Sequence, residues 1–126
     1  MGMRDTGPYD SVEAFIAAAP PAVQVTLQDL QAQLQDLLPG AATRISYQVP
    51  VFVVGKQVVG MGYSADLVSL YTMSPPLLRD IATQVRALGC RVSGATVGVP
   101  HGRLFPHQVV ELIVQRRLVE LGITTG

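Results

Sequence analysis

The chain has 126 residues, nine basic and nine acidic side chains, and a formal net charge of zero. Apolar residues make up 48% of it and charged residues only 14%, and the mean hydropathy is +0.35. A disordered chain is excluded, because disorder goes with low hydrophobicity and high net charge. The length predicts a single domain, and the absence of a basic excess argues against nucleic-acid binding by phosphate neutralisation.

The number of cysteines and the length of the apolar runs predict the cellular compartment of the protein. Cys90 is the only cysteine, so no intramolecular disulfide can form, which is typical of a reducing environment. The first residues lack the pattern of an export signal, and no apolar run approaches the roughly 20 residues of a membrane span. We therefore expect a cytoplasmic protein that does not enter a membrane.

The N-terminal third reads as an arm followed by two helices. Residues 1–9 predict a flexible arm, and a capping-box pattern at 10–13 predicts a short helix over about 11–18. A second helix begins at Pro21 and ends before Pro39, because leucines and valines recur at steps of three and four on one stripe. The stripe consists of Val23, Leu27, Leu30, Leu34 and Leu37.

The middle of the chain reads as a meander of strands. Alternation over 45–49 predicts a strand that includes Tyr47, and Pro50 marks a sheet edge or a bulge. Gly55-Lys56 predicts the turn of a hairpin with a positive φ at the glycine. A further turn near 64–66 precedes a strand over 67–72.

The C-terminal part reads as helix, two short strands and helix. Ser74 predicts an N-cap with Pro75 in the first turn, and Gly89 the left-handed stop. Two short strands follow near 91–92 and 96–99, then a loop at 100–106, a helix over about 107–121 and a tail at 122–126. Because this last helix is apolar on two sides, it lies either between sheet and helices or against a partner subunit. With the low charge, this favours a homodimer.

The element order predicts an α+β fold in which an antiparallel sheet packs against N-terminal and C-terminal helices. The single domain covers 10–121.

At this point the sequence resembles a known family. Ile45-Ser46-Tyr47, Pro50 and Phe52 form the pattern Ile-Ser-Tyr-x-x-Pro-x-Phe, which is similar to the YdhG-like family of small bacterial domains. The similarity extends over roughly 10–121 and includes Gly55-Lys56, Tyr71, Ser93, Pro100 and Pro106. Most members have no assigned function, but one is described as a frataxin-like intracellular iron chaperone. The resemblance implies the YdhG-like fold.

The departures from the family pattern concern its polar site. Where the family carries a Lys and a His on its middle strand, this chain has Ala65 and Leu67, and a common basic position is Gly98. Iron binding is implied by family analogy alone. Asp29 and Asp36 share a helix face but lie about 10 Å apart along its axis, too far to chelate one ion. We therefore expect no metal site and no cofactor.

The remaining chemistry predicts binding rather than catalysis. The candidate ligand-binding residues are Ser46, Tyr47, Tyr71, Ser93, His101 and Arg103. Arg103 could bind an anion with Ser93 and His101 if the fold brings them together, and the tyrosines either line a pocket or fill the core. No nucleophile elbow or nucleophile–base pair is visible, so no catalytic residue is expected. Arg79 and Arg86 read as a mixed solvated helix face.

The sequence thus predicts a non-enzymatic binding protein of the YdhG-like family, acting on a small ligand or a protein partner. The alternative is a frataxin-like iron-binding chaperone.

Overall fold

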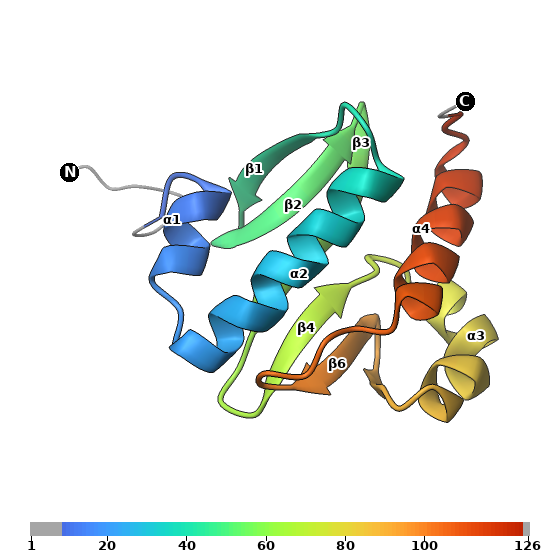
Figure 1. Cartoon of the computed structure of the whole chain (residues 1–126). Helices are drawn as coiled ribbons and strands as arrows, with labels where there is room; N and C mark the ends of the chain where they lie inside the picture. The colour runs from blue at the N-terminus through green and yellow to red at the C-terminus, as the bar shows by residue number, and fades with distance from the viewer. Residues whose placement is uncertain (1–8, 125–126) are drawn as a thin grey trace.

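The computed structural model describes residues 9–124, which form an α+β fold as predicted. Along the chain, two helices are followed by four strands, a third helix, two more strands and a fourth helix (Figure 1). The helices are α1 (Val12–Ala17), α2 (Pro21–Leu37), α3 (Pro75–Ala87) and α4 (His107–Leu121). The strands are β1 (Ala42–Ser46), β2 (Val49–Val54), β3 (Lys56–Tyr63), β4 (Leu67–Tyr71), β5 (Arg91–Ser93) and β6 (Thr96–Pro100).

The six strands form one antiparallel sheet in the order β1-β2-β3-β4-β6-β5. Only the step from β4 to β6 leaves the order of the sequence, because α3 and β5 intervene. Short turns at 47–48, 55 and 64–66 connect β1 to β2, β2 to β3 and β3 to β4, so these neighbouring strands pair as antiparallel hairpins. Strands β1 and β5 therefore form the two edges of the sheet.

The expected strand through Tyr47 is wrong. The chain turns at Tyr47 and Gln48, which have φ values of +51° and +67°, and Ser46 pairs with Val49 across this turn. Two consecutive positive φ values give the type I′ geometry that suits the twist of a hairpin. Pro50 is also not on an edge strand, because β2 pairs with both β1 and β3; the register shift lies between Phe52 and Val53.

Side-chain caps begin two of the helices. Ser11 caps α1 by accepting from the Ala14 N–H at 3.0 Å, so the cap lies one residue after Asp10, where the predicted capping box begins. Ser74 caps α3 as predicted, by accepting from the Leu77 N–H at 3.3 Å. A side-chain oxygen at this position satisfies a backbone donor that the helix leaves free. Gly89 follows α3 with φ of +93°, a conformation that carries a steric cost for residues with a Cβ.

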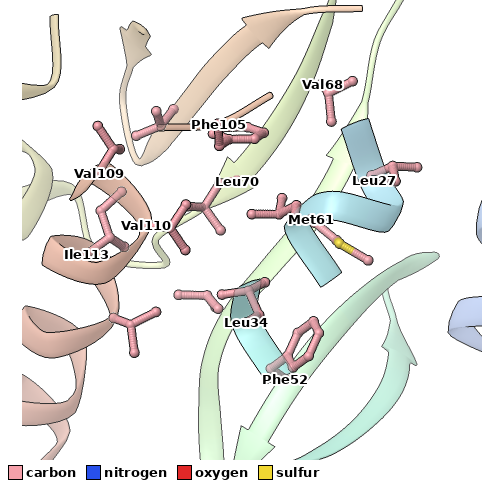
Figure 2. Packing of buried hydrophobic residues seen from close by; sticks show 14 of the residues in the cluster. Leu27, Leu34, Phe52, Met61, Val68, Leu70, Phe105, Val109, Val110 and Ile113 are labelled. Atoms are coloured by element: carbon pink, nitrogen blue, oxygen red, sulfur yellow. The ribbon is translucent and has the colours of Figure 1, made fainter. Parts of the chain in front are cut away.

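All four helices pack on one face of the sheet. Figure 1 shows α1 and α2 across the β1–β4 side and α4 beside α2, with α3 next to α4. Their buried side chains form one core with alternate strand residues such as Phe52, Met61 and Leu70. In Figure 2, Leu34 lies near Phe52 and Met61, and Val110 near Leu70. Leu27, Leu34, Met61 and Leu70 are fully buried.

Helix α4 is buried on two sides within this chain. Val109, Val110, Ile113, Val114 and Leu118 are its buried residues, and the helix contacts β3, α2 and α3. Packing between the sheet and the other helices is therefore enough to explain the wide apolar arc of α4. The arc no longer argues for a partner subunit. Val119 is the exception, at 80% exposed.

The packed unit extends slightly beyond the predicted boundaries. The Tyr9 ring packs edge-on against Phe15 with 5.3 Å between centroids, and Ile123 is partly buried against the core. The rest of the predicted arm, residues 1–8, lies outside the described residues. Within 9–124, every helix is too short or too polar to cross a bilayer.

Candidate functional site

Strand register places Ser46, Tyr71 and Ser93 of the predicted site on the sheet face turned away from the helices. We call this the outer face. One row of paired residues crosses all six strands and consists of Arg44, Val51, Gly60, Tyr71, Thr96 and Ser93. Directly paired residues share a face. Val51 is 1% exposed but lies outside the helix-side core, as this assignment requires.

Glycines make the outer face a packed apolar surface. A Cβ at Gly62 would lie 2.7 Å from Tyr71 Oη and 3.0 Å from its Cε2, so the tyrosine ring rests directly on this glycine. At Gly98 a Cβ would lie 3.0 Å from Leu67 Cδ1. The absence of side chains at 62 and 98 therefore lets Tyr71 and Leu67 lie against the sheet.

Two of the three positions that depart from the family pattern, Leu67 and Gly98, lie in direct contact. Leu67 occupies the space that a side chain at position 98 would need, and its strand neighbour Ser69 pairs with Gly98. The contact between this leucine and this glycine is apolar. The cations of this face are Arg44 and Arg91 on the two edge strands, and Arg91 pairs directly with Gly98.

Ser46, Tyr47 and Tyr71 have different surroundings and do not share a contact. The Ser46 hydroxyl accepts a hydrogen bond from Gln57 Nε2 at 3.3 Å. Tyr47 stands at the tip of the β1–β2 turn and is 92% exposed. Tyr71 is half-buried against Gly62.

The predicted grouping of Ser93, His101 and Arg103 does not form. Ser93 pairs with Thr96 at one end of β6, and His101 follows the other end, which separates them by about 17 Å along the strand. His101 Nε2 lies 2.9 Å from the Ser64 carbonyl oxygen. Arg103 is exposed in a loop fastened to α2.

That loop is held by two polar residues of α2 that sequence reasoning missed. The buried Thr26 hydroxyl donates to the Arg103 carbonyl at 2.9 Å and accepts from the Gly102 N–H at 3.1 Å. Gln33 donates to the Phe105 carbonyl at 3.1 Å. A threonine on an apolar stripe was the available signal, because a buried hydroxyl needs a partner.

Metal and thiol chemistry find little support. Among residues 9–124, no three His, Cys, Asp or Glu side chains come together as a metal site would require. Asp29 instead accepts from Gln33 Nε2 at 2.9 Å. Cys90 is 5% exposed, and burial raises the pKa of its thiol, which keeps it protonated and unreactive at neutral pH.

A pocket of about 530 Å³ lies between α3 and the β5–β6 hairpin, and the sequence did not predict it. It is larger than the groove of about 380 Å³ between α3 and α4. Its walls are one stripe of α3 and the hairpin across from it. The lining residues are Pro75, Arg79, Ala82, Thr83, Arg86, Val92 and Gly94.

The charge of this pocket is uncompensated. Its two charged lining residues, Arg79 and Arg86, are both cationic. In the described part of the chain, no carboxylate lies within 4.0 Å of either guanidinium. The nearest acid in sequence, Asp80, lines a different hollow and pairs with Arg116 of α4 at 3.9 Å. Arg79 and Arg86 are exposed, as the predicted solvated helix face requires, and they also supply the cations of this pocket.

Comparison with known proteins supports the fold and adds no activity. No family model and no curated protein matches the chain. Its structure is similar to the crystal structure of YdhG from Bacillus subtilis, described as a protein of the DUF1801 family, with a TM-score of 0.78. The match covers 87% of this chain and 90% of the other, at 12% identity. The YdhG-like fold predicted from the sequence is confirmed.

Proposed function

We propose that this protein is a non-enzymatic binding protein that takes a small anionic molecule in the pocket between α3 and the β5–β6 hairpin. The observation that carries the proposal is the pair Arg79 and Arg86, which line one hollow with no acidic neighbour in its walls. A volume of about 530 Å³ is in the range of small-molecule sites.

The lining suits an anion chemically. A guanidinium presents several N–H donors in a plane and binds carboxylate or phosphate oxygens in pairs. Thr83 adds a hydroxyl between the two arginines on the same helix stripe, and Val92 and Ala82 supply apolar walls. The pocket can therefore hold a molecule with an anionic group and a carbon frame.

Binding without catalysis is supported by the separation of the reactive groups. Ser93 of β5 lies beside the first residue of β6, whereas His101 follows its last residue, so they do not form a nucleophile–base pair. Cys90 is buried, and its thiol is protonated at neutral pH. Iron handling gains no support from the His, Cys, Asp and Glu side chains within residues 9–124, since no three of them come together.

The experiment is an NMR titration of backbone amides with inorganic phosphate and with sulfate at low ionic strength. We expect saturable shifts at Thr83, Val92 and Gly94. Arg79→Gln and Arg86→Gln should each weaken binding about tenfold or more, since a charge-assisted hydrogen bond contributes about 1.5–3 kcal/mol.

Arg91→Gln is the matched control. Arg91 lies on β5 next to Val92, but it pairs with Gly98 on the outer face and does not line the pocket. The Arg91→Gln substitution therefore removes one positive charge near the pocket without changing its lining. We expect its affinity to stay within about twofold of the parent. Equal losses in all three variants, or no saturable shift with either anion, would overturn the proposal.

A further inference from the structure

We infer that the ligand of this pocket carries two anionic groups, one for each arginine, joined by an uncharged spacer. This inference rests on the proposed function and specifies its ligand class. The class comprises linear dicarboxylates.

The spacing of the arginines carries the first step. Arg79 and Arg86 are seven residues apart on α3, an uninterrupted helix from Pro75 to Ala87. Seven residues advance about 10 Å along the axis and return to nearly the same side of the helix, about 20° short of two turns. The two arginine side chains therefore leave the helix at opposite ends of the same wall.

The lining between the two arginines carries the second step. Ala82 and Thr83 occupy the intervening positions of the stripe, and Val92 lies across the pocket from α3. These side chains present methyl groups and a single hydroxyl, with no charge. A spacer of methylene or hydroxyl-bearing carbons matches this middle section, whereas a third charge there would be desolvated without a partner.

The count of charges carries the third step. The hairpin contributes no cation to the pocket, because Arg91 and Ser93 belong to rows on the outer face while Val92 lines the cavity. Two positive charges with no acidic group in the lining are balanced by a dianion. A monoanion would leave one guanidinium facing solvent without a counter-charge.

The test compares diacids and monoacids of matched length on the full chain. Succinate, adipate and suberate are titrated beside hexanoate and octanoate, with amide shifts or calorimetry as the readout. We expect adipate or suberate to bind about tenfold tighter than the monoacid of the same length, and tighter than succinate, because only the longer diacids reach both arginines.

Single variants identify where each end binds. Arg79→Gln and Arg86→Gln should each lower the affinity for the preferred diacid to that of the monoacid, and Arg91→Gln should leave the preference intact. Because both arginines lie at exposed positions of α3, we expect the variants to fold. Their amide spectra check this.

The outcomes separate the two proposals. If monoacids bind as tightly as diacids of the same length, or succinate as tightly as suberate, the two-anion inference is wrong, and the anion-binding pocket stands. If neither the acids nor phosphate gives saturable shifts at the pocket, the proposed function itself fails.

Discussion

The contact between Tyr71 and Gly62 on the outer face gives a prediction with a magnitude. A Cβ at position 62 would lie 2.7 Å from Tyr71 Oη and 3.2 Å from its Cζ, below ordinary van der Waals separation. Because the ring is rigid, Gly62→Ala forces the whole side chain to tilt away. Overpacking of this kind costs about 1–3 kcal/mol, and replacing a glycine within a strand recovers about 0.5–1 kcal/mol. We expect a net loss of about 1–2 kcal/mol.

The assay is a double-mutant cycle by urea denaturation, with Tyr71→Ala as the second change. Once the ring is absent, Gly62→Ala should cost nothing or stabilise the protein by about 0.5–1 kcal/mol, which gives a coupling of about 1–3 kcal/mol. Gly98→Ala is the control, because its neighbour is the terminal methyl of the flexible Leu67 and should yield at lower cost. An identical cost of Gly62→Ala with and without the ring would refute the packing described for this face.

Three further predictions concern the polar residues and the thiol of the fold. Thr26→Val removes both hydrogen bonds to the loop and should cost about 1–3 kcal/mol, with faster hydrogen exchange at the Gly102 amide; unchanged exchange there would contradict the role of Thr26. The Ser74 hydroxyl, followed by Arg117, lowers the pKa of the Glu120 carboxyl, so its stabilisation is present above the unfolded pKa of about 4.3 and is lost as the pH falls through the lower folded value. The stability gap between the parent and Glu120→Gln should therefore close in acid, and a gap that persists unchanged to low pH would rule this linkage out. Cys90 should react with a thiol reagent only after unfolding, and rapid labelling of the native protein would show that the site is open.

Local patterns predicted much of the fold because their causes are local. The stripe of Val23, Leu27, Leu30 and Leu34 is fully buried, since one helix face at that period must meet the core. Ser74 caps α3, and Gly89 ends it in a positive φ, because capping depends on residues within one turn.

The turn at Tyr47 and Gln48 could not be read in this way. Neither residue is the glycine or asparagine that normally marks a type I′ turn. The turn is imposed by the pairing of β1 with β2, from Ser46 opposite Val49 to Ala42 opposite Val53. Alternation across the turn then imitates a continuous strand.

The predicted grouping of three polar residues does not form, for a related reason. Ser93, His101 and Arg103 are close in sequence, but an extended β6 separates the first two by its own length. The pocket forms because α3 packs beside the edge strand β5, a contact between segments that no sequence period encodes. Only that contact turns Arg79 and Arg86 from a helix face into the wall of a cavity.

The most direct test of the account is the amide spectrum of the parent protein titrated with suberate, beside that of the Arg79→Gln, Arg86→Gln double variant. The account predicts saturable shifts at Thr83, Val92 and Gly94 that disappear in the double variant. Shifts that persist in the double variant, or that gather on the outer face around Tyr71, would contradict it.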